Sequence, residues 1–369
     1  MKSTILLVLL ITAGIASLNA QDAIRWQNPL SSDVPVVQGR AWHTELSNPY
    51  DRLPSKAEKT VRPEVWNLSH NTAGECIEFT TNAKEIVVRY AVSGALNMPH
   101  MPSTGVSGVD LYAKDKQGEW HWAKGKYNFA DTITYRYTNI QSATPLTFFR
   151  LYLPLYNTVK WLEIGTLESD PIVFSKAGDK KPLVLYGTSI LQGACASRPG
   201  LAWTNILGRK LDLPVINLGF SGNGRLEPAV TDLLNETDPA VFVLDCLPNL
   251  TSKAQFPDDT IRARIHASVK SLQSKHPATP VLLTEHSCGI ASVSLDSATL
   301  ADCERVNKVL EQTFMEMKSS GAKNIYLLTA KEIGLGAEST VDGIHPNDIG
   351  MMQYAVAYEK IIRQILSGK

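Results

Sequence analysis

The stretch LVLYGTSILQG at residues 183–193 guides the interpretation of the whole chain. Its apolar start is typical of a buried strand in a parallel sheet, and the glycine and polar residues that follow predict a tight turn. This turn places the hydroxyl of Ser189 at the carboxyl end of a strand, the edge at which open α/β sheets bind ligands. Ser189 is therefore the candidate nucleophile, although an ordinary strand-to-helix turn has the same pattern.

A serine hydroxyl becomes a good nucleophile only when a base removes its proton. The segment VDGIHPN at residues 341–347 places Asp342 three residues before His345. At this spacing the carboxylate can orient the imidazole ring of its own turn. The segment predicts the base, although a capped turn before a helix would look similar.

The oxyanion that forms after attack needs hydrogen-bond donors. Two further segments follow apolar strands, NLGFSGNG at residues 217–224 and DCLPN at residues 245–249. They offer the main-chain N–H of Gly222 and the side-chain amide of Asn249. Because all these groups fall at strand ends or on the last loop, one shared active site is favoured over four unrelated loops.

From about Lys181 to its end, the chain resembles the SGNH (GDSL-like) hydrolase family, whose four sequence blocks carry Ser, Gly, Asn and Asp-x-x-His. The resemblance implies a role for each matching residue: Ser189 as nucleophile, the N–H groups of Ser189 and Gly222 and the amide of Asn249 as oxyanion donors, and His345 as the base oriented by Asp342.

The sequence departs from the usual family pattern in two blocks. Gly187-Thr188-Ser189 stands for Gly-Asp-Ser, and Leu247-Pro248-Asn249-Leu250 stands for Gly-x-Asn-Asp. With GVDLY at residues 108–112, these variants are similar to a two-domain bacterial subgroup that has a GxDLY-type N-terminal domain. The likeness covers nearly all of the chain after residue 20.

The length of 369 residues predicts two domains. The segment SKAGDKKP at residues 175–182 is rich in charge, glycine and proline, so we place the boundary between residues 21–178 and 179–369. With 36 basic and 36 acidic side chains the formal charge is zero, which favours neither nucleic acid nor an anionic membrane as a partner. The sequence leaves the oligomeric state open.

The two halves have different periodicities. Residues 21–178 show short strands, turn residues and no convincing helix, which predicts an all-β sandwich or jelly roll. The expected strands are 85–92, 108–113, 119–124, 145–153 and 159–164. Residues 179–369 alternate five apolar strands with helices, which predicts an α/β domain with a parallel sheet in the flavodoxin-like order.

Residues 1–20 have the charged start, apolar run and small-residue end of a secretory signal peptide. We expect cleavage near Ala20 and an exported protein, periplasmic or extracellular, that is not inserted in a membrane after cleavage. An uncleaved N-terminal anchor is the alternative interpretation.

Five cysteines are an odd number for an exported chain, so at least one is unpaired or pairs between molecules. A disulfide between Cys195 and Cys246 is one interpretation, and buried free thiols are the favoured one. No two cysteines or histidines show metal-ligand spacing, so we expect no metal and no cofactor.

Four other residues are candidates for substrate binding. His100 lies in the long loop 97–105, which contains two prolines and two methionines and either packs at the domain interface or lines the cleft. Arg198 and Trp203 follow the nucleophile turn and either shape a subsite or pack at a helix start. His286 follows the fourth strand of the second domain, where capping or packing is the favoured alternative.

The sequence therefore predicts an exported serine esterase that works through an acyl-enzyme. The family resemblance implies an acetylated carbohydrate as substrate. The His100 loop and the pair Trp120 and Trp122 suggest that the β-domain forms a wall of the cleft. A lipid or small-ester esterase is one alternative. A non-catalytic carbohydrate-binding protein on a hydrolase scaffold is the other.

Overall fold

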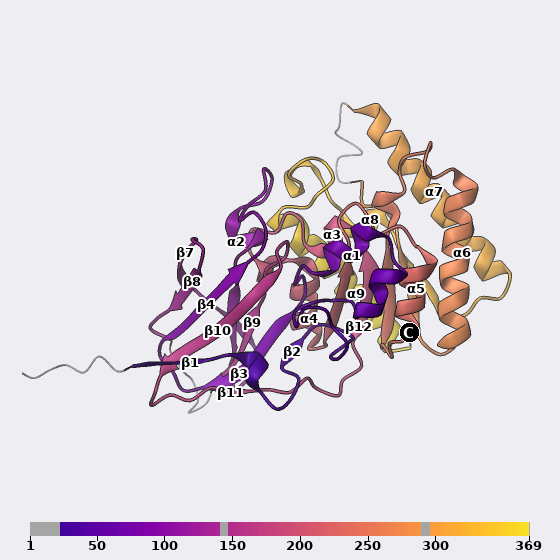
Figure 1. The fold of residues 1–369 in the computed structure, drawn as a ribbon. Coiled ribbons are helices and arrows are strands. Elements are labelled where there is room, and N and C mark those ends of the chain that lie inside the picture. Colours follow the sequence, from indigo (N-terminus) through magenta and orange to yellow (C-terminus); the bar gives the residue numbers. More distant parts are fainter. Residues whose placement is uncertain (1–22, 141–146, 289–295, 369) are drawn as a thin grey trace, which may run out of the picture.

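The computed structural model describes residues 23–140, 147–288 and 296–368. Two units lie side by side, an antiparallel β-structure built from the first half of the chain and an α/β structure built from the second (Figure 1). The expected signal peptide, residues 1–20, lies outside the described residues. None of the helices described is both long and apolar enough to cross a membrane.

The first unit is a sandwich of two antiparallel sheets. One has the strand order β1-β10-β4-β8-β7, and the other has the order β11-β3-β9-β5-β6 with β2 paired to β3. Their inner faces bury a shared apolar core that includes Phe79, Tyr90 and Phe149, which confirms the predicted sandwich. The strands are β1 (Ile24–Gln27), β2 (Val37–Gln38), β3 (Cys76–Thr81), β4 (Ile86–Val92), β5 (Asp110–Lys114), β6 (Trp120–Ala123), β7 (Gly125–Asn128), β8 (Ile133–Tyr137), β9 (Thr147–Tyr152), β10 (Val159–Leu167) and β11 (Val173–Phe174).

The expectation that the first half contains no helix is wrong. Helices α1 (Pro63–Ser69) and α2 (Ser103–Val106) and the 3₁₀ turns η1 (Pro29–Ser31) and η2 (Ser55–Lys59) lie between its strands. A helix as short as α1 is marginal without tertiary contacts. It is stabilised by packing of Val65 and Trp66 into the core of the second unit. Because the helix has only seven residues, its sequence is too short to show a helical period.

The second unit is a five-stranded parallel sheet in the order β13-β12-β14-β15-β16. Numbered within this unit the order is 2-1-3-4-5, which confirms the predicted flavodoxin-like arrangement. The strands are fully or largely buried because helices cover both faces. They are β12 (Leu183–Gly187), β13 (Val215–Gly219), β14 (Val241–Asp245), β15 (Val281–Thr284) and β16 (Ile325–Leu328).

Two groups of helices cover this sheet. Apolar side chains of α5, α6, α7 and α1 pack on one face, and those of α3, α4, α8 and α9 pack on the other. Figure 1 shows α5, α6 and α7 on the side remote from the β-sandwich. These helices are α3 (Ser189–Gln192), α4 (Trp203–Leu211), α5 (Pro228–Leu234), α6 (Asp258–Lys275), α7 (Ser297–Ser319), α8 (Ala330–Ile333) and α9 (Asp348–Leu366).

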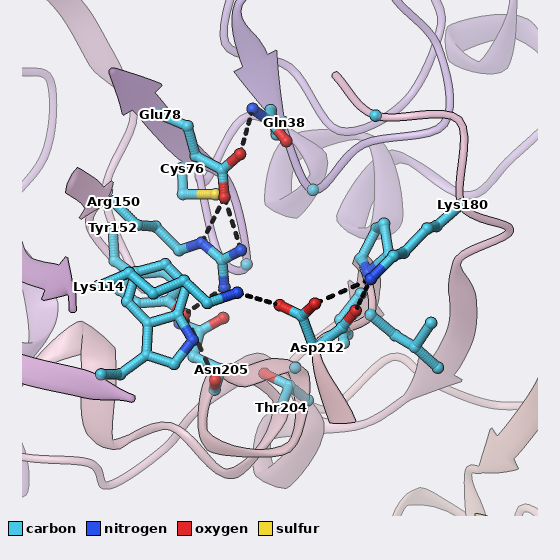
Figure 2. A pocket seen from close by; sticks show the side chains of 18 of the residues that line it. Gln38, Cys76, Glu78, Lys114, Arg150, Tyr152, Lys180, Thr204, Asn205 and Asp212 are labelled. Carbon is cyan, nitrogen blue, oxygen red and sulfur yellow. Dashed lines mark hydrogen bonds and ion pairs between the residues drawn. The ribbon is translucent and has the colours of Figure 1, made fainter. Parts of the chain in front are cut away.

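A cavity of about 370 Å³ lies at the interface between the two units (Figure 2). Lys114 of β5 and Lys180 of the linker each lie 2.8 Å from a carboxylate oxygen of Asp212, which follows α4. Arg150 pairs with Glu78 on the sandwich side. Of these pairs only Lys114–Asp212 joins the two units, and it does so at the amino end of β13, opposite the end that leads to the candidate active site.

Cys288 and Cys303 form a disulfide, which links the segment after β15 to α7. The pairing was not predicted. Cys195 and Cys246 are free and buried, as is Cys76, so the favoured free-thiol interpretation is confirmed. The ring of His286 and the two disulfide sulfurs gather within 4.8 Å of one another, but both sulfurs are used in the disulfide.

Candidate active site

Ser189 is the first residue of α3, directly after the turn that ends β12. Its side chain is buried, and its Oγ lies 2.8 Å from Nε2 of His345. The two residues are 156 positions apart in sequence, and the parallel sheet brings them together at the carboxyl edge of β12. A neutral imidazole at this distance can accept the hydroxyl proton.

The loop before α9 holds Asp342 and His345 in one compact turn. Oδ2 of Asp342 lies 2.7 Å from Nδ1 of His345, and Oδ1 accepts the main-chain N–H of His345 at 2.8 Å. Burial alone would raise the pKa of Asp342, but the hydrogen bonds and charge of His345 and the N–H of Ile344 outweigh it and lower that pKa. Asp342 therefore stays ionised and fixes the orientation of the ring.

Gly222 and Asn249 lie on two loops that meet beside the nucleophile turn. Gly222 has φ +70°, a left-handed conformation that favours glycine. Oδ1 of Asn249 accepts the N–H of Gly224 at 3.0 Å, so its amide NH₂ is left to donate elsewhere. A Cβ on Gly224 would lie 2.0 Å from the carbonyl oxygen of Gly187, so glycine there permits this close approach.

Removal of the Asn249 amide gives the first testable prediction. Asn249→Ala deletes one preorganised donor while leaving Ser189, Asp342 and His345 in place. We expect kcat for an aryl acetate to fall by about 10²–10³ with little change in KM, because the donor acts on charge that develops in the transition state. Steady-state kinetics check this, and an effect confined to KM would show that the amide binds substrate instead.

His100 reaches the candidate site from the β-sandwich. Its exposed ring lies with its centroid 5.8 Å from that of His345. The base of its loop packs on the second unit, where Oγ1 of Thr104 donates to the carbonyl oxygen of Ser197 at 2.6 Å. Both alternatives for this loop therefore apply, since its base packs at the interface and its tip lies beside His345.

Arg198 and Trp203 make packing contacts, Arg198 with the first unit and Trp203 with the core of the second. Arg198 pairs with the carboxylate of Asp110 and donates to the Tyr112 hydroxyl at 2.7 Å. These contacts join the GVDLY segment of the first unit to the second unit. Trp203 is fully buried, and its ring stacks on Tyr358 with centroids 4.2 Å apart. The subsite expectation for Trp203 is wrong because the first residue of α4 faces the core.

His286 is buried rather than open to the cleft. Burial and the nearby His345 lower its pKa to about 4. Its main-chain N–H donates to Oδ1 of Asn307 at 2.8 Å, and its Nδ1 accepts from the N–H of Cys288 at 3.3 Å. The favoured packing interpretation describes this residue.

The buried ring of His286 predicts a pH-dependent stability. Because its folded pKa lies below the ordinary value of 6.5, the unfolded chain binds this proton more tightly, and stability falls as the pH drops from about 6.5 to 4. We expect His286→Gln to remove about 2–3 kcal/mol of the loss between pH 7 and pH 4.5. Urea unfolding at both pH values measures it, and an unchanged loss in the variant would contradict it.

Four residues that support the site were not found from the sequence. Gln192 accepts the N–H of Ser221 at 3.0 Å, and the Tyr156 hydroxyl donates to the Ser189 carbonyl oxygen at 3.2 Å. Arg52 and Arg62 bind the strand end and loop that lead to Gly222. No motif marks them, because each acts across a contact between segments far apart in the chain.

Comparison with known proteins defines the class. Residues 180–363 match the GDSL-like lipase/acylhydrolase family, and residues 24–172 match the GxDLY family, the N-terminus of SGNH-hydro-type esterases. A Bacteroides ovatus protein assigned as a GDSL-like lipase is 30% identical, with a TM-score of 0.84 over 94% of this chain and 98% of that one. The chain therefore belongs to the GDSL-like (SGNH) hydrolase family, as its motifs predict.

Two more distant structures share the fold. The salicylyl-acyltransferase SsfX3 of a tetracycline biosynthetic pathway is 19% identical, with a TM-score of 0.69 over 93% of this chain and 97% of that one. A family two carbohydrate esterase from Cellvibrio japonicus is 12% identical, with a TM-score of 0.56 over 94% and 98%. No curated protein sequence matches the chain.

Proposed function

We propose that the protein is an exported serine esterase that removes acetyl groups from carbohydrates. The observation that carries the esterase chemistry is the hydrogen-bonded series of Ser189, His345 and Asp342, with distances of 2.8 and 2.7 Å. This order of nucleophile, base and orienting carboxylate is the arrangement that acyl transfer requires.

The proposed mechanism has two steps. His345 takes the proton of Ser189, Oγ attacks the ester carbonyl, and the N–H groups of Ser189 and Gly222 with the amide of Asn249 bind the oxyanion. His345 then protonates the departing alcohol. Water, activated by the same base, attacks the acyl-serine and releases the acid.

Two observations support a carbohydrate substrate. The carbohydrate esterase of Cellvibrio japonicus has the same two-part architecture over nearly its full length. In this chain the polar, exposed His100 brings the first domain to within 5.8 Å of His345, measured between ring centroids. A hydroxyl-rich alcohol group would find a hydrogen-bonding partner there.

The test is a panel of acetylated polysaccharides, an aryl acetate and an aryl ester with a long acyl chain, assayed with wild-type protein. We expect release of acetate from a polysaccharide and faster hydrolysis of the aryl acetate than of the long-chain ester. A preference for the long chain would favour a lipid esterase. Binding of polysaccharide without turnover of any ester by the folded protein would favour the non-catalytic alternative.

A further inference from the structure

We propose that the first domain completes the candidate oxyanion site. In this view Arg62 and Arg52 are positioning residues that fix the loop at residues 220–224, here called the oxyanion loop, which carries Gly222. The inference rests on the proposed function, because it concerns the donor that would bind the oxyanion. It differs from a role of the first domain in binding substrate.

Gly222 itself has one local contact, since its carbonyl oxygen accepts a hydrogen bond from Nε of Arg225 at 3.1 Å, but it has little packing around its Cα. A Cβ built on this residue would meet no atom within 4 Å, so nothing packs against it at that point. As a glycine it is also free to change its backbone angles at low cost. The direction of its N–H is therefore set by the residues on either side, Ser221 and Asn223.

Arg62 holds the far side of the oxyanion loop. It precedes α1, and its Nη1 donates to Oδ1 of Asn223 at 2.9 Å, while its Nη2 lies 3.4 Å from the carbonyl oxygen of Asn223. Its Nε donates to Glu227 at 2.5 Å. The planar guanidinium thus spans from the residue after Gly222 to the start of α5, which a single-point contact could not do.

Asn223 passes this constraint to the rest of the oxyanion loop. Its Nδ2 donates to the carbonyl oxygen of Ser221 at 2.8 Å, and its N–H donates to that of Phe220 at 2.8 Å. Gly222 lies inside this small hydrogen-bonded ring. Fixing the Asn223 side chain from outside therefore fixes the peptide that presents the Gly222 N–H.

Arg52 holds the near side, where β13 ends and the oxyanion loop begins. It is buried, and its Nη1 donates to the carbonyl oxygens of Asn217 at 3.0 Å and Gly219 at 2.8 Å. Its other donors bind the carbonyl oxygens of Leu68 and Asn71 in the first domain, both at 2.7 Å. Burial lowers its pKa to about 10, so it remains charged at neutral pH.

The same interface supplies a matched control. Lys56 of η2 pairs with Glu236 at 2.8 Å, and this ion pair also joins the first domain to the second. It does not touch the oxyanion loop. Loss of the Lys56 pair tests interface contacts in general, whereas loss of Arg62 tests support of the oxyanion loop.

The experiment compares Arg62→Met, Arg62→Lys and Lys56→Met in the full chain, with an aryl acetate well below the melting temperature. For Arg62→Met we expect kcat to fall about tenfold or more and KM to change less than about threefold, because the support acts in the transition state. Arg62→Lys should recover part of the loss, since an amine can still reach Asn223. Lys56→Met should match wild type.

A double-mutant cycle with Asn223→Ala shows whether Arg62 acts through the loop. Coupled residues give non-additive losses, so Arg62→Met combined with Asn223→Ala should be no slower than Asn223→Ala alone. Independent, multiplying losses would overturn the proposal. A loss of Arg62→Met activity that appears only in KM, or that Lys56→Met reproduces, would overturn it as well.

A covalent probe separates this inference from the proposed function. An aryl phosphonate reacts with an activated serine and places its phosphoryl oxygen where the oxyanion would lie. Slower labelling of Ser189 in Arg62→Met than in wild type supports the positioning role. Equal labelling of the two proteins overturns the positioning role and leaves the proposed function standing. If the wild-type protein neither reacts with the phosphonate nor hydrolyses any ester, both the proposed function and the positioning role are overturned.

Discussion

Ser189→Ala is expected to abolish ester hydrolysis and leave the protein folded. Loss of the nucleophile from a catalytic triad lowers kcat by about 10⁴–10⁶. The Oγ of Ser189 forms a hydrogen bond with His345, so its removal should cost only about 1 kcal/mol in the free energy of unfolding. Initial rates with an aryl acetate and a thermal melt of both proteins provide the measurement.

A residual rate near one tenth of wild type would remove Ser189 from the mechanism. The aryl phosphonate gives an independent check, because its adduct should appear by mass spectrometry on the peptide containing Ser189 and be absent in the variant. Labelling of a different serine would identify another nucleophile. Ser197→Ala serves as the control variant, because the Oγ of Ser197 donates to Asp348 at 2.6 Å and we expect its removal to leave labelling of Ser189 unchanged.

The second domain could be predicted from the sequence almost element by element. Its strands are apolar runs that end in glycine or polar residues, and the expected alternation of five such strands with helices is observed. Parallel strands buried on both faces leave a clear signal, since their burial does not depend on the partner domain. The four segments that carry the candidate site residues could be predicted as well, because each of them follows an apolar strand or precedes a helix.

The first domain was harder to predict. Strand β7 contains Gly125 and exposed polar side chains, so it lacks the alternation of a half-buried strand. Helix α1 has too few residues for a period, and its apolar side chains face another domain. These elements are stabilised by contacts between segments distant in sequence, which one sequence without its fold cannot reveal.

The same contacts explain why the supporting residues were missed. Nothing in the sequence distinguishes Arg52 from an arginine on the surface, yet in the folded chain this residue is only 1% exposed. A buried arginine needs several acceptors around it. Those acceptors are carbonyl oxygens of residues 68, 71, 217 and 219, a set that only the folded chain brings together.

The largest expected effect on stability follows from removing the first domain. By size alone, residues 179–369 are long enough to fold independently. In the structure, however, Leu53, Val65 and Trp66 are part of the core that covers one face of the second sheet. Burial of each such side chain contributes about 1.5–3 kcal/mol, and their joint loss approaches the total stability of a typical domain, about 5–15 kcal/mol.

We therefore expect residues 179–369 expressed alone to show no cooperative melting transition and less than about a hundredth of the full-length activity, on an aryl acetate as well as on acetylated polysaccharide. The matched control is full-length protein with a protease site inserted between residues 176 and 179, where the linker is partly or fully exposed. After cleavage the two parts should stay associated and active, because side-chain contacts hold them together. An isolated second domain that hydrolyses the aryl acetate at the full-length rate, and loses activity only on the polymer, would show instead that the first domain serves substrate binding alone.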